Sequence, residues 1–263
     1  MSAKPRRESQ KERKRLARKI RNGTMDSKFS MRTIQPLTNT QSDLFADYKQ
    51  GFNICAIGTA GTGKTMCAMY LALNDVLSKD EYDQIVIVRS AVQTREQGFM
   101  PGTQAQKEAV YATPYADIAN DLFQRGDAWD ILKQKNQVKF MTSSFVRGLT
   151  FDNSIIIVDE CQSMTYHELD SIITRVGETS KIFFCGDTAQ DDLATNRHKN
   201  DVSGLASFVK VLERINMFSI VKFGVEDIVR SGLVKDYIIA KECAINGQVR
   251  TPVSYGKSQF AVA

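Results

Sequence analysis

The chain has 263 residues, of which 42% are hydrophobic and 25% are charged, a composition typical of globular proteins with a large core. It contains no run of eighteen or more apolar residues, and no apolar segment follows its basic N-terminus. We therefore expect neither a transmembrane helix nor a signal peptide. The five cysteines form no C-x-x-C pair, so a zinc site is not expected, and reduced thiols in a cytoplasmic protein are the simplest interpretation.

The positive charge is concentrated at the N-terminus. Residues 1–32 carry twelve Lys and Arg but only three acids, a net charge of +9, which leaves −4 for the other 231 residues. With so few apolar side chains this segment is expected to be a disordered basic arm. Such an arm suits contact with nucleic acid phosphates, although a solvated tail or a targeting address would have a similar composition.

Strand and helix patterns alternate over residues 33–245, which indicates one α/β domain with a mostly parallel sheet. Near-continuous apolar runs, as expected of strands buried on both faces, occur at Asn53–Ile57, Gln84–Val88, Val138–Thr142, Ser154–Val158, Lys181–Cys185 and Ser219–Phe223. Helical patterns cover Thr65–Leu77, Thr165–Val176, Ser203–Arg214 and Asp227–Ala244. Residues 246–263 are expected to form a loosely ordered C-terminal tail.

The first motif in the domain is a phosphate-binding loop between a predicted strand and a predicted helix. The segment Gly58-Thr59-Ala60-Gly61-Thr62-Gly63-Lys64-Thr65 fits G-x-x-x-x-G-K-[ST] at every fixed position, and Met66 follows it. Glycines let the backbone curl so that its N–H groups face an anion, and the following helix N-terminus favours the same charge. Lys64 is expected to neutralise the β- and γ-phosphates and Thr65 to hold Mg²⁺. Residues 58–66 thus predict a site for a nucleoside triphosphate.

Residues 91–137 interrupt the simple alternation and predict a helical insertion. It begins with the turn Gly98-Phe-Met-Pro-Gly102 and continues with two helical stretches. Long insertions on such scaffolds are often functional. Its aromatic residues either stack on single-stranded bases or pack in the core; they are Phe99, Tyr111, Tyr115 and Trp129.

Two carboxylates follow the strand Ile155–Val158 directly. At the carboxyl end of a buried strand beside the phosphate loop, Asp159 is expected to bind Mg²⁺ through water. Glu160 is expected to polarise the water that attacks the γ-phosphate.

Polar residues also end the next buried strand, in Gly186-Asp187-Thr188-Ala189-Gln190. Gln190 is expected to hydrogen-bond the γ-phosphate or the attacking water. The alternative is an ordinary turn in which Asp187 is a cap.

Taken in order, Gly58–Thr65, Asp159-Glu-Cys-Gln162 and Gly186–Gln190 resemble motifs I, II and III of superfamily 1 helicases. More narrowly, residues 36–242 resemble the PhoH family of ATPases. Five stretches carry this resemblance: Thr38–Gln41, Gly98–Gly102, Phe145–Phe151, Ile173–Gly177 and Asp227–Arg230. The short chain looks like the compact PhoH-like proteins that bacteriophages often encode.

The resemblance implies a single RecA-like core that binds ATP and Mg²⁺, with Gln41 recognising adenine. Superfamily 1 helicases have two such cores and receive arginines from the second. This chain has room for one, so the resemblance implies a homo-oligomer, expected to be a hexameric ring, with an arginine acting in trans. The candidates are Arg175 and Arg230, followed by Arg147.

The function expected from these motifs is an ATPase coupled to single-stranded nucleic acid, RNA rather than DNA, as a helicase-like or remodelling enzyme. An ATP-dependent switch or assembly factor that acts on a protein partner would need the same site without nucleic acid. A nucleotide kinase is a third alternative, which the glutamate after Asp159 disfavours.

Overall fold

The computed structural model describes residues 29–78, 81–90, 104–187 and 204–245. Its strands form one parallel six-stranded sheet in the order β3-β2-β4-β5-β1-β6. The strands are β1 (Asn53–Gly58), β2 (Gln84–Arg89), β3 (Val138–Thr142), β4 (Ser154–Asp159), β5 (Lys181–Gly186) and β6 (Phe218–Phe223). The helices are α2 (Asn39–Gln50), α3 (Lys64–Ser78), α4 (Gln104–Phe123), α5 (Ala128–Gln134), α6 (Tyr166–Ile173), α7 (Leu205–Leu212) and α8 (Gly232–Ile245).

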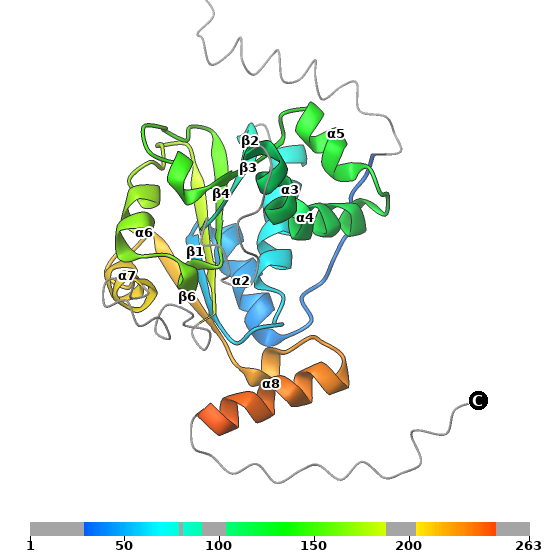
Figure 1. Ribbon diagram of the computed structural model, residues 1–263, viewed down its shortest axis with the longest axis vertical. Helices are drawn as coiled ribbons and strands as arrows, with labels where there is room; N and C mark the ends of the chain where they lie inside the picture. The colour runs from blue at the N-terminus through cyan, green and yellow to red at the C-terminus, as the bar shows by residue number, and fades with distance from the viewer. Residues whose placement is uncertain (1–28, 79–80, 91–103, 188–203, 246–263) are drawn as a thin grey trace, which may run out of the picture.

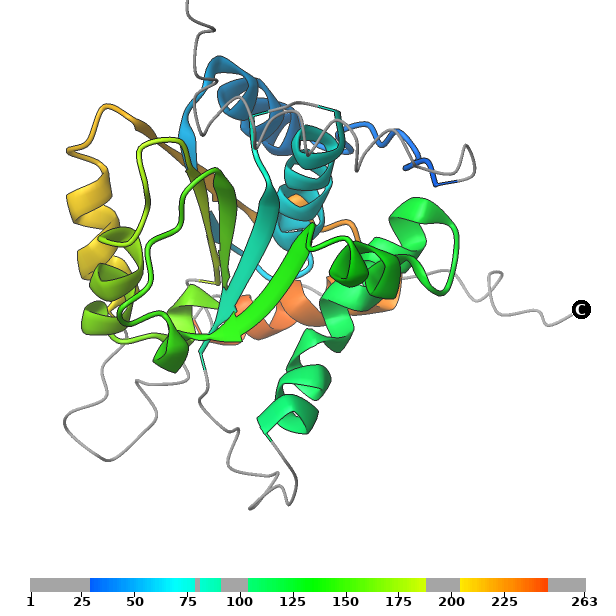
Figure 2. The ribbon, with the colours of Figure 1, turned by 90° about the horizontal axis from the view of Figure 1, so that it is seen from above.

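Helices cover both faces of the sheet (Figures 1 and 2). Helices α2, α3, α4 and α5 pack on one face, and α6 and α7 pack on the other, so that two apolar clusters form. All six residues of β4 are buried, because this strand lies between two others and under helices on both sides. Helix α8 lies apart from both layers, beyond one end of the sheet (Figure 1).

The α/β class and the parallel sheet predicted from the sequence are confirmed. Each strand agrees with its prediction to within one residue at either end. In a parallel sheet every strand ends at the same edge. The residues that follow β1, β4 and β5 therefore meet there, as their motifs require. No helix in the described ranges is both long and apolar enough to span a membrane.

Two elements differ from the sequence prediction. Helix α2 was not predicted; it begins after Thr38, whose hydroxyl accepts the Gln41 N–H, and ends at Gly51 with φ +103°. The C-terminal helix was predicted to start at Asp227 but starts at Gly232. Asp227 instead ends a short 3₁₀ turn and accepts the Gly224 N–H, 3.0 Å away, while the Val229 N–H bonds to the phosphate loop.

The end of the predicted basic arm belongs to the folded core. Phe29 is buried and stacks on Phe123, with ring centroids 4.3 Å apart. Arg32 forms an ion pair with Asp121 of α4. Residues 1–28 of the predicted arm and the predicted tail 246–263 lie outside the described residues.

Candidate nucleotide site

The predicted phosphate loop joins β1 to α3 at the carboxyl edge of the sheet. Gly58 has φ +126°, and a Cβ atom there would collide with the carbonyl oxygen of Phe223 on β6. Gly61 also has a positive φ, +75°. The glycines are therefore needed for the curl of the loop and for its close approach to β6.

Lys64, the first residue of α3, turns its side chain back into the loop. Its Nζ atom donates to the carbonyl oxygens of Gly58, 2.9 Å away, and Thr59, 2.7 Å away. Burial lowers the pKa of this ammonium group, while the nearby charge of Asp187 acts in the opposite direction. The side chain thus holds its ammonium group at the centre of the predicted phosphate loop.

Asp159 and Thr65 meet beside the loop. The Thr65 hydroxyl donates to Oδ1 of Asp159 over 2.9 Å, and the carboxylate is almost fully buried. Burial and the neighbouring Glu160 raise the pKa of Asp159, while hydrogen bonds from Tyr115 and Thr65 lower it.

These oxygen atoms fit the ligand preference of Mg²⁺, which binds one or two protein groups and completes its shell with water and phosphate oxygens. No group of three or more His, Cys, Asp or Glu residues in the described ranges is arranged to hold a metal by itself.

Glu160 follows β4 in a strained backbone conformation. Its φ is +54°, in the left-handed region that glycine favours. The half-buried carboxylate lines the pocket and accepts a hydrogen bond of 2.5 Å from the Gln162 side chain. An observed strain of this kind is common at functional sites.

Gln162 links the segment that follows β4 to the segment that follows β5, a role that the sequence analysis missed. Its Nε2 bonds to Glu160, and its Oε1 accepts the backbone N–H of Asp187, 2.9 Å away. The position of Gln162 three residues after Asp159 was visible in the sequence. Its partner after β5 was not, because that contact exists only once β4 and β5 are paired.

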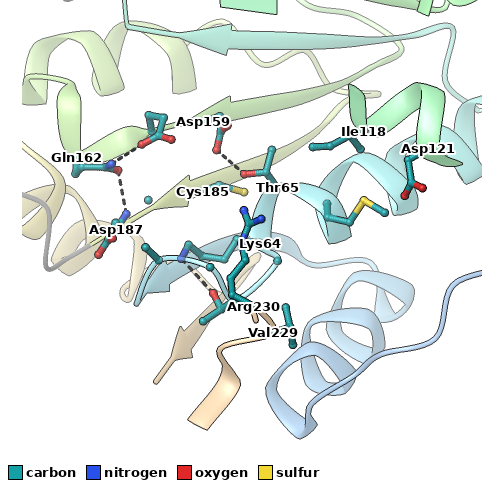
Figure 3. Close-up of a pocket in the computed structure, with 17 residues that line it drawn as sticks. Lys64, Thr65, Ile118, Asp121, Asp159, Gln162, Cys185, Asp187, Val229 and Arg230 are labelled. Carbon is teal, nitrogen blue, oxygen red and sulfur yellow. Dashed lines mark hydrogen bonds between the residues drawn. The ribbon is translucent and has the colours of Figure 1, made fainter. Parts of the chain in front are cut away.

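A cavity of about 700 Å³ opens around these groups (Figure 3). The loop residues 60–66, Asp159, Glu160 and Arg230 all line it, as do Ile118 and Asp121 of α4. The predicted phosphate, metal and acid groups are therefore brought together in one pocket. The helical insertion forms part of its wall, which the sequence did not indicate.

Gln41 reaches the phosphate loop from α2. Its Nε2 donates to the carbonyl of Thr62 over 2.9 Å, and its Oε1 accepts the Leu37 N–H over 2.8 Å. Gln41 is buried and is not among the residues that line the cavity. The structure thus shows a contact between Gln41 and the loop, whereas its role in adenine recognition stays a prediction.

The three candidate arginines occupy different places. Arg230 lies beside the phosphate loop of its own chain (Figure 3), where its Cγ covers Gly61. Arg175 lies near the start of β4, since its carbonyl accepts the Phe151 N–H; this is the opposite edge of the sheet from Asp159. Arg147 is exposed after β3. Arg230 is thus placed for action in cis, and Arg175 can reach a nucleotide only in another subunit.

Of the two roles expected for the aromatic residues of the insertion, packing rather than base stacking holds for Tyr115. This side chain is fully buried, and its hydroxyl donates to Asp159. Trp129 is also largely buried, and Tyr111 is half-buried. Phe99 and Gln190 lie outside the described residues.

The sequence matches the family model described as PhoH-like protein over residues 33–242. It is 35% identical to Protein PhoH of Escherichia coli over 185 residues, which are 68% of this chain and 50% of the relative. It is 31% identical to a PhoH-like protein of Bacillus subtilis over 210 residues, 80% of this chain and 64% of the relative. The chain thus spans about half to two thirds of the length of these curated relatives.

The solved structures that match this chain have lower sequence identity to it. The large terminase of a thermophilic bacteriophage, in complex with ADP, matches with a TM-score of 0.46 and 11% identity, over 77% of this chain and 49% of that one. The UvsW helicase of bacteriophage T4 matches with a TM-score of 0.42 and 18% identity, over 74% of this chain and 62% of that one.

Proposed function

Because the chain belongs to the PhoH family, we propose that it binds ATP with Mg²⁺ in the cavity around Lys64 and hydrolyses it. One observation carries the proposal: the Thr65 hydroxyl and the buried Asp159 carboxylate meet 2.9 Å apart beside the loop that holds Lys64. This combination supports the proposal, because a cation and a pair of hard oxygen ligands suit the phosphates and the Mg²⁺ of a bound nucleotide.

Each residue has a role in this proposal. The loop N–H groups and Lys64 bind the phosphates, Thr65 and Asp159 hold Mg²⁺, and Glu160 takes the proton of the attacking water. When bound, Mg²⁺ supplies positive charge that offsets the charge of the phosphates. Gln41 contributes to the recognition of adenine, and Gln190 hydrogen-bonds the γ-phosphate or the attacking water.

We further propose that the chain acts as a homo-oligomer, a hexameric ring, in the cytoplasm. Arg175 lies at the edge of the sheet opposite to Asp159, so a role for it in hydrolysis needs a neighbouring subunit. Arg230 would contribute from within its own chain, and Arg147 is exposed and available to a neighbour. An arginine of this kind contributes roughly 10³-fold or more to the rate.

The ATPase is proposed to act on single-stranded nucleic acid, with RNA favoured, as a helicase-like or remodelling enzyme. Its support is the net charge of +9 in residues 1–32 and the resemblance to helicase motifs. Phosphates neutralised by such an arm release counterions, so binding would weaken steeply with salt. An ATP-dependent switch acting on a protein partner is the alternative.

The test is steady-state ATP hydrolysis with and without single-stranded RNA, compared with Lys64→Ala, Glu160→Gln and a deletion of residues 1–28, which leaves the buried Phe29 in place. We expect hydrolysis that RNA stimulates, that both substitutions abolish and that loses its response to RNA in the deletion. Hydrolysis indifferent to RNA would favour the protein-partner switch. An unchanged rate in Lys64→Ala would overturn the ATPase site itself.

A further inference from the structure

The carboxylate of Asp159 is held from two sides. Thr65 of the phosphate loop donates to Oδ1, and Tyr115 of α4 donates to Oδ2, each over 2.9 Å. Two donors on different oxygen atoms fix both the position and the plane of a carboxylate. Only one of the two donors belongs to the phosphate loop; the other comes from the helical insertion.

Tyr115 is well suited to hold Asp159 still. It is fully buried, so water does not compete for its hydroxyl. Its ring lies 5.8 Å from that of Phe140 on β3, and Ala119 and Leu122, later on α4, are also fully buried. A phenol is protonated at neutral pH, so the hydroxyl is the donor in its bond to Asp159.

The chain offers a natural comparison for this bond. Tyr48 of α2 donates to Asp75 of α3, also over 2.9 Å and also buried. That bond lies near the opposite edge of the sheet, because Lys181, the first residue of β5, donates to the Tyr48 carbonyl. The two tyrosines make the same kind of bond, but only Tyr115 makes it to a residue that fits a metal.

We propose that Tyr115 is a positioning residue for the Mg²⁺ site, through which α4 and the bound metal stabilise each other. The inference rests on the proposed function, since it assumes that Asp159 holds the metal of a bound nucleotide. Groups that orient a metal ligand typically change metal affinity by about 10- to 100-fold when removed. Because linkage is reciprocal, metal binding that depends on Tyr115 must also stabilise the helix that carries it.

The experiment measures Mn²⁺ affinity in the presence of a non-hydrolysable ATP analogue, for the wild type, Tyr115→Phe and Tyr48→Phe. Affinity for the analogue in EDTA is measured in parallel. We expect Tyr115→Phe to weaken Mn²⁺ binding about tenfold while analogue affinity in EDTA is unchanged. Tyr48→Phe, which loses a buried bond of equal length, should bind Mn²⁺ as the wild type does.

Hydrogen exchange of the wild type supplies a second measurement that needs no variant. Adding Mg²⁺ to the analogue-bound protein should slow exchange in α4 but not in α7, on the other face of the sheet. Equal Mn²⁺ affinity in Tyr115→Phe and wild type, an equal loss in Tyr48→Phe, or unchanged exchange in α4 would overturn this inference alone. Failure of the wild type to bind the analogue would overturn the proposed function, and this inference with it.

Discussion

Glu160 has a strained backbone conformation, and its side chain lines the pocket. A left-handed conformation costs a non-glycine residue about 1–2 kcal/mol, and Glu160 adopts it with φ +54° directly after β4. Its carboxylate is then held by Gln162, which is itself fixed by the Asp187 N–H. The orientation of the proposed base therefore depends on a neighbour that does not itself react.

The first prediction concerns this neighbour. Gln162→Ala removes both the donor to Glu160 and the acceptor of the Asp187 N–H, so we expect kcat for ATP hydrolysis to fall about tenfold with KM nearly unchanged. Steady-state kinetics measures both constants. Ser163→Ala, in the same short turn, is the matched control and should hydrolyse ATP at the wild-type rate. A larger effect on KM than on kcat would contradict an orienting role.

The second prediction concerns the thiols. Burial raises the pKa of Cys55 and Cys67 to about 12 and raises those of Cys161 and Cys185 as well, while Cys243 on α8 is only half-buried. At pH 8 a thiol with a pKa of 12 is ionised in about one molecule in ten thousand. We therefore expect an aromatic disulfide reagent to label one thiol rapidly in the native protein.

The same reagent should label all five cysteines after denaturation in guanidinium chloride, which serves as the control for the count. Rapid reaction of a second thiol in the native state would show that one of the four buried sites opens readily. Mass spectrometry of the labelled protein identifies the position, and Cys243→Ser should abolish the rapid phase.

At the scale of elements, helix α2 contacts the predicted phosphate loop through Gln41. Its N-cap, Thr38, accepts the backbone N–H of Gln41, and the Gln41 side chain in turn donates to Thr62 of the phosphate loop. Gln41 is also close enough to Gly63 that a Cβ atom there would lie 3.1 Å from its Nε2. The start of α2 therefore supports one side of the loop.

The third prediction follows from this contact. Thr38→Ala should lower the free energy of unfolding by about 1 kcal/mol, the usual cost of a lost N-cap, and should also weaken ATP binding a few-fold. Denaturant unfolding and nucleotide titration measure the two effects. Thr38→Ser keeps the hydroxyl and should retain both properties. Loss of stability without any change in ATP affinity would show that α2 does not contribute to ATP binding.

The sequence predicted the strands far better than the contacts between motifs. The strands were predictable because β1, β2, β4 and β5 are apolar runs buried on both faces. Polar or glycine residues that line the cavity follow β1, β4 and β5. Helix α2 has little apolar periodicity, so only its cap at Thr38 and Gly51 marks it. The bond from Tyr115 to Asp159 joins residues 44 positions apart, and no local pattern encodes such a contact.

At the scale of the whole molecule, the two edges of the sheet separate the candidate arginines. Arg230 lines the cavity of its own chain, while Arg175 lies where β4 begins, a strand length of about 15–20 Å from Asp159. A six-residue strand is too long for one arginine side chain to span. If both arginines serve hydrolysis, Arg230 acts in cis and Arg175 acts in trans.

The fourth prediction uses mixtures of inactive subunits to separate these cases. Arg175→Ala and Arg230→Ala should each lower kcat by roughly 10³-fold if the residue acts on the γ-phosphate. Lys64→Ala has a dead site but intact arginines. Mixed in equal amounts with Arg175→Ala, it should restore about a quarter of the wild-type rate, since a quarter of the interfaces in a head-to-tail ring then join an intact site to an intact Arg175.

An equal mixture of Lys64→Ala and Arg230→Ala should stay inactive, because an arginine that acts in cis cannot be supplied by a neighbour. Subunit exchange is verified beforehand by energy transfer between Lys64→Ala subunits that carry a donor dye and Arg175→Ala subunits that carry an acceptor dye. Recovery in the Arg230 mixture would place that residue in trans, against the position beside Gly61 seen here. Absence of recovery in the Arg175 mixture, with exchange verified, would remove Arg175 from the site and with it the structural argument for a ring.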